Sequence, residues 1–422
     1  MKEKIIKIIK HPLIYGSSIV VIGNISANFF NFLFNVFMTR NLSNADYGVL
    51  ASIISVISFP ALIAAATIPL VINFAGTFFA QGKLDMARAF YYKIMKFFFI
   101  VSLILFVSFL LFIPSLSNFL HINDTPLLIM TSFIIFLGII SVINSAFIQA
   151  KLAFGSQVMV SMVGAIAKLG IGVPAVVLGF MVSGAVGAIF LSAILAYIVS
   201  FIPLKFIFQK NLKKPKVSVS TRELLNYGIP SMLTWIGLTS LISIDILLVK
   251  HYFDPTNAGI YAGMALIGKV IFYVSSPIGS VMFPMVVQKY SNNESFSSTF
   301  KLSLLLVFTP SVILTVLYFL FPDPAILFFT KKAENLVVSP LLGLFGIFMS
   351  LYTLLFIIAN FYLSIKKTKI YIPVLLGAAA QIALILMYHE TFLQIISISV
   401  GITAVLVVGL ILYYYFVIRK SK

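Results

Sequence analysis

Cysteine is absent from this chain, and charged residues are scarce. Without cysteine there is no disulfide and no cysteine-bound metal. Only 9% of the 422 residues are charged whereas 61% are hydrophobic, and a water-soluble globule of that composition would have almost no polar coat. We therefore expect lipid to cover most of the surface.

The signatures of enzymes are also missing. Only 11 residues are acidic, and the histidines at His11, His121, His251 and His389 lack the spacing of metal ligands. A glycine-rich phosphate loop followed by Lys and Ser or Thr does not occur in the sequence, which excludes nucleotide hydrolysis by this chain. We expect a protein that is not an enzyme and that binds no metal or cofactor.

The sequence contains many long apolar runs. A helix needs about 20 apolar residues to cross a bilayer, and runs of that kind recur along the whole chain. They are too continuous for a membrane β-barrel, whose strands alternate in polarity. We predict an all-α polytopic membrane protein of about 12 transmembrane helices. The expected helices are 12–38, 48–79, 90–113, 125–149, 154–178, 182–207, 225–249, 257–287, 298–321, 337–364, 370–388 and 393–417.

The net charge of +18 would indicate a nucleic-acid partner in a soluble domain, but its distribution indicates a membrane topology. Along the expected helices, most of the 29 Lys and Arg residues fall on one side of the membrane. The opposite side holds only Arg40, Lys250, Lys331 and Lys332. By the positive-inside rule both termini lie in the cytoplasm, and we expect no nucleic-acid partner.

A basic connection at 209–224 divides the chain near its midpoint. We therefore expect an N-terminal six-helix bundle at 1–208 and a C-terminal six-helix bundle at 225–422. The connection itself is either a hinge between the bundles or a plain solvated loop, and the sequence favours neither.

The two halves carry a repeat in the same membrane orientation. Residues 35–40 read NVFMTR and residues 245–250 read DILLVK, so that Asn35 aligns with Asp245 and Arg40 with Lys250. A glycine follows in both halves, at Gly48 and Gly259.

The helix after each repeat segment contains two prolines, and we expect these prolines to break it. Helix breaks at matching positions are where transporters bend and line a pathway. The expected hinge residues are Pro60, Pro69, Pro277 and Pro284.

Four asparagines in the first helix, Asn24, Asn28, Asn31 and Asn35, follow a spacing of 4, 3 and 4 residues. At about 100° per residue they form one stripe, which would be costly against lipid and must face protein or water. The stripe either joins helices by hydrogen bonds or lines a cavity, and both interpretations stay open.

Three ionisable residues fall inside expected spans. An intramembrane charge is a candidate functional group by default. Asp245 could merely pair with Lys250 or another cation, and Lys269 could lie nearer a helix end than expected, whereas Lys168 is near the middle of its helix. Intramembrane cations exceed acids, which favours an anionic passenger.

These residues resemble a known family. Residues 16–18 (GSS), the asparagine-rich first helix and residues 39–48 (TRNLSNADYG) resemble the N-terminal signature of polysaccharide flippases. Residues 245–254 and 258–262 resemble the matching pattern of the second half. These Wzx-like exporters, the O-antigen flippases among them, belong to the multidrug/oligosaccharidyl-lipid/polysaccharide (MOP) superfamily.

The resemblance implies a MATE-like pair of bundles around a cavity that opens to either side of the bacterial cytoplasmic (inner) membrane in turn. It implies, as cargo, an undecaprenyl-pyrophosphate-linked oligosaccharide for O-antigen, capsule or exopolysaccharide, with other polysaccharide assembly proteins as partners. Arg40, Asp245 and Lys250 match the family pattern, and Asp245 is a candidate for coupling to H+ or Na+. Lys168 and Lys269 are added from their position alone, as cations that would receive the pyrophosphate.

Three alternatives stay open. A cation-coupled multidrug or metabolite exporter of the same superfamily would place acids rather than lysines in its cavity. Lipid II flippases typically have two more helices than this chain. A membrane glycan polymerase would need a large outer domain, which is missing here.

Overall fold

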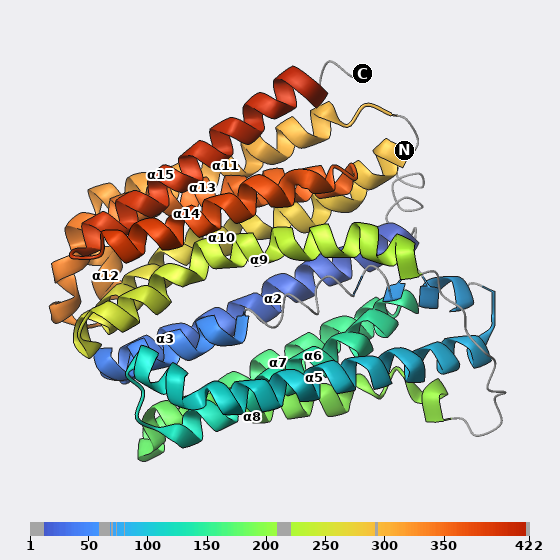
Figure 1. Ribbon diagram of the computed structural model, residues 1–422, viewed down its shortest axis with the longest axis horizontal. Helices are drawn as coiled ribbons and strands as arrows, with labels where there is room; N and C mark the ends of the chain where they lie inside the picture. The colour runs from blue at the N-terminus through green and yellow to red at the C-terminus, as the bar shows by residue number, and fades with distance from the viewer. Residues whose placement is uncertain are drawn as a thin grey trace, which may run out of the picture. The chain divides into compact units, whose positions relative to one another are not determined.

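A computed structural model describes residues 12–58, 68, 71–72, 74–79, 81–208, 221–291 and 294–418. All regular secondary structure within these ranges is helical (Figure 1). The main helices are α2 (Pro12–Asn41), α3 (Asn44–Ser58), α5 (Leu84–Leu120), α6 (Thr125–Ala150), α7 (Phe154–Ala175), α8 (Met181–Ser200), α9 (Thr221–Tyr252), α10 (Pro255–Ser291), α11 (Ser297–Leu320), α12 (Pro322–Thr330), α13 (Ser339–Ser364), α14 (Tyr371–Met387) and α15 (Phe392–Tyr413).

Nine stretches of helix within the described ranges are long and apolar enough to cross a membrane. One of them, Phe154–Ser200, contains two spans, because α7 and α8 pack against each other across a kink at Gly179 and Met181. Both kink residues have a positive φ, 93° and 44°. With α2 and the shorter apolar helix α3, the prediction of an all-α membrane protein of about twelve spans is confirmed.

Contacts divide the chain into two compact units. The first unit comprises residues 1–34 and 56–228 and includes α5 to α8, which lie side by side in Figure 1. Its core is rich in aromatic rings, with the Phe147 ring 5.1 Å from that of Tyr91 and 5.8 Å from that of Phe90. A buried polar chain crosses this core: Tyr91 donates to Asn144 (2.7 Å), and Asn144 donates to Ser200 (2.7 Å).

The second unit comprises residues 35–55 and 229–422. Helix α13 lies at its centre, in contact with α10, α11 and α15, and most of its side chains are buried. Stacked rings of Phe300 and Phe361, 3.9 Å apart, join α11 to α13. The unit is therefore built around one almost wholly apolar helix.

Residues 35–55 group with the second unit, whereas the boundaries expected from the sequence placed them in the first. The end of α2 and the start of α3 contact α10 and the segment after α12. The expected linker falls on residues that lie largely outside the described ranges, so its role as a hinge stays a prediction.

The expected break in the eighth span is wrong. Helix α10 continues through Pro277 and Pro284 as a single helix. A proline removes one backbone hydrogen bond, and a membrane helix tolerates this loss when neighbouring groups satisfy the freed carbonyl. Pro60 and Pro69 lie outside the described residues.

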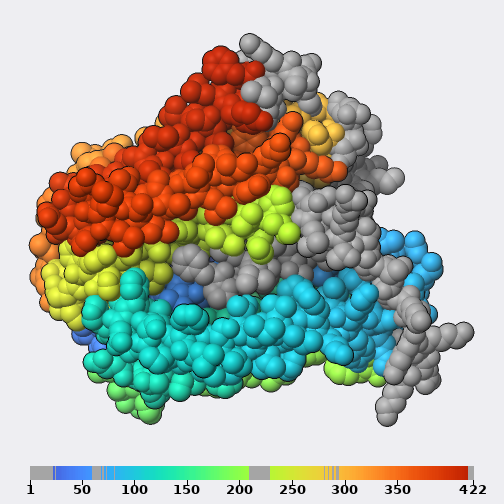
Figure 2. Space-filling view, viewed as in Figure 1, coloured from blue at the N-terminus to red at the C-terminus, as the bar shows by residue number. Residues whose placement is uncertain are grey.

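Large apolar side chains are exposed along the outer faces of the spans. In the second unit, Figure 2 shows the surface of α14 and α15 in orange and red. Leu376 of α14 and Val405 of α15 are both exposed. A helix with an exposed apolar face inside a polytopic protein is suited to contact with hydrocarbon chains. This surface agrees with the lipid cover that the composition predicts.

Candidate functional site

Lys168 is the clearest ionisable candidate in the first unit. It lies on α7 and is half-buried, with its ammonium nitrogen 4.8 Å from the centre of the Phe34 ring on α2. A cation held over an aromatic face is favourable, and more so where water is scarce. No acidic side chain of the described residues acts on it. The ammonium is therefore stabilised by a ring and not by a counter-charge.

The helix that carries Phe34 is held close to α7 by a glycine. A Cβ atom on Gly23 would lie 2.3 Å from Cγ2 of Val158, so α2 and α7 touch there. Gly23 of α2 contacts Val158 of α7, and Phe34 of α2 contacts Lys168 of α7. The number of residues between the two contacts is about the same on both helices. They therefore run parallel, as the first and fifth spans of a serpentine chain must.

The asparagine stripe on α2 has a varied environment. Asn28 is exposed, whereas Asn31 and Asn35 are half-buried and both take part in side-chain interactions. Asn24 belongs to the helix, but its side chain lies outside the described part of the structure. Asn35 groups with the second unit and the others with the first.

Asp245 on α9 is the most deeply buried acid among the described residues, at 1% exposure. The hydroxyl of Tyr261 on α10 donates to its Oδ2 atom (2.8 Å). Its Oδ1 atom has no hydrogen-bond partner in the described ranges, and Lys269, two turns beyond Tyr261 on α10, attracts it electrostatically. Lys269 thus has an acidic neighbour, whereas Lys168 has none among the described residues.

Gln381 on α14 is a second buried polar group that contacts α9. It donates to the carbonyl of Leu241, one helical turn before Asp245 on α9 (3.3 Å), and to Ser399 of α15 (2.8 Å). Its Oε1 atom, like Oδ1 of Asp245, has no partner within the described structure. The sequence analysis missed Gln381 and Tyr261. An amide in a nearly apolar span was the available signal for Gln381, whereas Tyr261 lies in the 258–262 segment that resembles the family pattern but was not singled out as a site residue.

Arg40 caps a helix. Its Nε donates to the Phe329 carbonyl (3.0 Å), its Nη2 donates to the Phe328 carbonyl, and its guanidinium carbon lies 5.8 Å from the centre of the Phe328 ring. These carbonyls belong to the last turn of α12, where a helix has no partners of its own. Arg40 therefore anchors α12 to the end of α2.

The loop between α2 and α3 is tied to the segment after α12 by polar side chains. Asn44 donates to Glu334 (2.8 Å) and to Asn335 (2.6 Å), and Lys332 donates to the Leu42 carbonyl and to Asn44 (3.1 Å). Burial lowers the pKa of Lys332, and the nearby Glu334 offsets part of that shift. Asn44 lies in the 39–48 segment that resembles the family signature, and Lys332 was counted among the cations of one membrane side, whereas Glu334 and Asn335 belong to no motif.

Lys250, at the end of α9, is 3% exposed and is attracted electrostatically to Asp46 of α3. Asp46 accepts a hydrogen bond from Ser43 (2.7 Å), and its own N–H donates to the Ser43 hydroxyl (3.1 Å). Lys250 belongs to the second copy of the repeat and Asp46 follows the first copy, so their attraction links the two copies.

The structure divides the expected site residues between the units. Lys168, Asn28 and Asn31 belong to the first, whereas the second holds Asn35, Arg40, Asp245, Lys250 and Lys269. A cluster of His, Cys, Asp or Glu that could hold a metal ion does not occur among the described residues.

Several solved structures share this fold. An inward-facing multidrug resistance MATE family transporter of the MOP superfamily has a TM-score of 0.71 at 13% identity, over 92% of this chain and 93% of that one. The lipid II flippase MurJ, in an inward closed conformation, has a TM-score of 0.71 at 16% identity, over 94% and 86%. A MOP superfamily transporter from Pyrococcus furiosus has a TM-score of 0.62 at 14% identity, over 96% and 94%.

The predicted MATE-like fold is therefore confirmed, and identities this low show the fold alone. No curated protein matches the sequence. A family described as "Polysaccharide biosynthesis protein" matches residues 37–337, which is more than half of the chain and includes segments of both halves of the repeat. The resemblance seen in the sequence is thus confirmed, and the chain belongs to this family of polysaccharide biosynthesis proteins.

Proposed function

We propose that this protein is a flippase that moves undecaprenyl-pyrophosphate-linked oligosaccharide across the bacterial cytoplasmic membrane by alternating access, with both termini in the cytoplasm. The product would be used for O-antigen, capsule or exopolysaccharide. Membership of a polysaccharide biosynthesis family and a fold shared with a lipid II flippase support a transporter, not an enzyme.

Lys168 is the observation that carries the cargo assignment. An ammonium group inside a membrane span is costly unless water, an acid or an anion satisfies it. The Phe34 ring provides one partner, and no acidic side chain in the described ranges provides another. A pyrophosphate would supply the missing negative charge through charge-assisted hydrogen bonds, and the amides of Asn28 and Asn31 could bind sugar hydroxyls.

Asp245 and Lys269 are assigned a different role within this proposal. Their mutual attraction leaves Lys269 less available to cargo, while the unpartnered Oδ1 atom of Asp245 can take up H+ or Na+. Uptake of a cation would weaken the attraction to Lys269 and so couple ion binding to movement of α10. Arg40 and Lys250 would contribute positive charge near one end of the pathway.

The hinge residues of the proposal are those expected from the sequence. Pro277 and Pro284 lie within the continuous helix α10, which would bend there during the transport cycle. Pro60 and Pro69 would serve the second span in the same way.

The test is complementation of a gene deletion with Lys168→Gln and Lys168→Arg. We expect the deletion strain to accumulate lipid-linked oligosaccharide on the cytoplasmic leaflet, Lys168→Gln to leave that accumulation in place, and Lys168→Arg to relieve it at least in part. Lys301→Gln, which removes an exposed lysine of α11, is the matched control and should restore surface glycan.

Two results would contradict the proposal. Normal surface glycan with Lys168→Gln at wild-type expression would remove Lys168 from the cargo site. Unchanged lipid-linked intermediates in the deletion strain, together with altered dye efflux, would instead favour a cation-coupled drug or metabolite exporter.

A further inference from the structure

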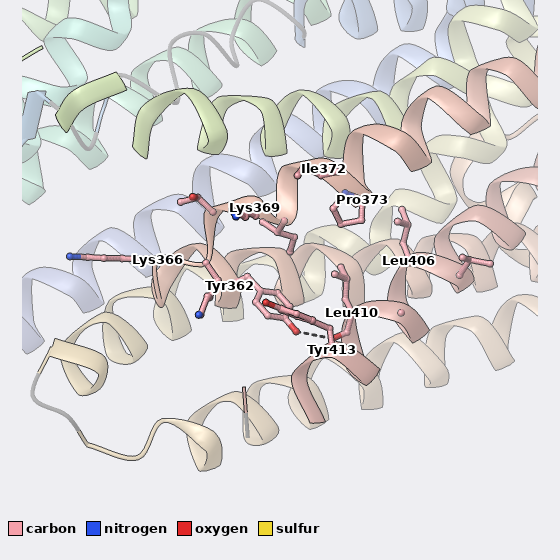
Figure 3. Close-up of a pocket in the computed structure, with 13 residues that line it drawn as sticks. Tyr362, Lys366, Lys369, Ile372, Pro373, Leu406, Leu410 and Tyr413 are labelled. Carbon is pink, nitrogen blue, oxygen red and sulfur yellow. Dashed lines mark hydrogen bonds between the residues drawn. The ribbon is translucent and has the colours of Figure 1, made fainter. Parts of the chain in front are cut away.

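A pocket of about 850 Å³ opens in the second unit where three helices end (Figure 3). Its walls come from the end of α13, the short helix Thr368–Ile370, the start of α14 and the last turns of α15. All of these segments belong to one unit, and their residues lie within the described ranges.

The pocket has two chemically distinct ends. Lys366, Lys367 and Lys369 surround one end, and all three are exposed. Apolar side chains form the other end, among them Leu406 and Leu410, and Figure 3 shows Leu406 across the pocket from Lys366. Among the described residues, no acidic side chain lines the pocket. It therefore offers positive charge beside an apolar surface.

The floor of the pocket is held in place by a hydrogen bond. The Tyr362 hydroxyl donates to the Leu410 carbonyl (2.7 Å), which joins α13 to α15 and is drawn as a dashed line in Figure 3. Because the Tyr362 hydroxyl is engaged in this bond, the apolar ring is the part of this side chain that is left to line the pocket. The lysines follow in a tight turn, where Lys366 has a φ of 58° and the Lys367 N–H donates to the Tyr362 carbonyl.

By length and composition, the apolar spans around the pocket end beside it, where hydrocarbon would meet the polar headgroups. The span Ala333–Ser364 ends just before the lysines, Thr368–Met387 begins beside them, and Phe392–Phe416 ends against the pocket. Val405 of α15, which lines the apolar end, is 72% exposed on the face that lipid would cover. Basic pockets between membrane helices at this level are suited to anionic headgroups.

We propose that this pocket binds an anionic phospholipid of the surrounding membrane. The headgroup phosphate would lie among Lys366, Lys367 and Lys369, and one acyl chain would run along Ile372, Val405 and Gly409 towards the bilayer centre. Charge complementarity selects the occupant, because the described residues at the polar end include three cations and no acid. The proposal does not depend on the transported cargo.

Gly409 offers a direct way to fill the pocket. A Cβ atom at Gly409 would meet no atom within 4 Å, so a leucine there would extend into open space. Gly401 on the same helix is also open, but it does not line the pocket. Gly401→Leu is therefore the matched control for Gly409→Leu.

The experiment uses the full chain in detergent, with phosphatidylglycerol and phosphatidylcholine of identical acyl chains as probes. Native mass spectrometry counts retained lipid, and thermal melting records stabilisation. We expect phosphatidylglycerol to be retained at least about tenfold better, since lysines near the membrane surface attract an anionic headgroup. The triple variant Lys366→Gln, Lys367→Gln, Lys369→Gln should abolish this preference, Gly409→Leu should reduce binding of both lipids, and Gly401→Leu should change neither.

Three outcomes would overturn the proposal. The first is equal retention of both lipids by the unaltered protein, and the second is an unchanged preference in the triple lysine variant. The third is displacement of phosphatidylglycerol by an equimolar polyprenyl pyrophosphate, which would make the pocket a cargo site and not a membrane-lipid site. None of these readouts requires transport, so failure here is distinguishable from failure of the proposed function.

Discussion

Gly48 of α3 and Gly259 of α10 pack directly against each other. A Cβ atom on Gly48 would lie 3.0 Å from the backbone nitrogen of Gly259, and one on Gly259 would lie 1.5 Å from the carbonyl oxygen of Asn44. Gly48 lies five residues after Ser43, and Gly259 lies five residues after Asp254. The side chains of Ser43 and Asp254 each cap the start of the helix that contains the glycine. The two halves of the repeat therefore meet at equivalent positions, where only glycine allows the backbones this close.

The contact predicts a strong effect of a single methyl group. In Gly259→Ala the added carbon would overlap backbone atoms, which cannot move aside as a side chain can. We expect a loss of about 3 kcal/mol or more of stability, at the upper end of the cost of overpacking. Thermal melting of the purified protein measures it, with Gly401→Ala, in open space, as a control that should stay within about 1 kcal/mol. Equal melting of the two variants would contradict the packing.

The sequence predicted the class of fold and the repeat because both depend on local patterns. Apolar run length fixes the spans, and the match of Asn35 and Arg40 to Asp245 and Lys250 revealed the duplication. It did not predict that residues 35–55 group with the second unit. That grouping depends on contacts such as Gly48 with Gly259, which join positions far apart in the chain.

A second prediction concerns the buried carboxylate of Asp245. Tyr261→Phe would remove the donor to Oδ2 and leave both oxygen atoms without a described hydrogen bond, at a cost of about 1–3 kcal/mol. The cost should fall by at least about 1 kcal/mol in an Asp245→Asn background, because a neutral amide depends less on the hydroxyl. A double-mutant cycle of melting measurements tests this. Additive effects of the two substitutions would show that the bond is not important.

The candidate site was only partly predictable from the sequence, because the sequence shows which charges are buried but not what satisfies them. Both Lys168 and Lys269 were expected to receive an anionic cargo, yet Lys269 is attracted to Asp245 while Lys168 lies over Phe34. Arg40 looked like a cavity residue, and its contacts with the carbonyls of α12 became visible only in three dimensions.

The buried chain from Tyr91 through Asn144 to Ser200 predicts unequal effects of neighbouring tyrosines. Tyr91→Phe would leave the Asn144 amide oxygen without its donor inside the core, at a cost of about 1–3 kcal/mol. Tyr92→Phe is the matched control, because the Tyr92 hydroxyl donates to the Ile207 carbonyl but its side chain is 49% exposed. There water replaces the lost bond, so we expect a change below about 0.5 kcal/mol. Melting curves of the two variants that shift equally would contradict this assignment.

The start of α10 predicts a dependence of stability on pH. Asp254 accepts hydrogen bonds from the backbone N–H groups of Thr256 (3.1 Å) and Asn257 (3.0 Å), and the bond from Asn257 is the main cause that lowers the pKa of this carboxyl. A carboxyl with a lowered pKa stabilises the fold at pH values above its unfolded pKa of about 3.9. That contribution is lost as the pH falls through the lower, folded value.

Asp254→Asn isolates the charge, because asparagine caps a helix about as well as aspartate does. At pH 7 we expect the variant to be less stable by about 0.3–1 kcal/mol, the value of a negative charge at a helix N-terminus. The difference should shrink as the pH falls below about 4, because protonation makes the natural side chain neutral as well. Melting temperatures of both proteins at pH 7 and pH 3 measure it. A difference that stays constant across this range would mean that the charge of Asp254 does not stabilise α10.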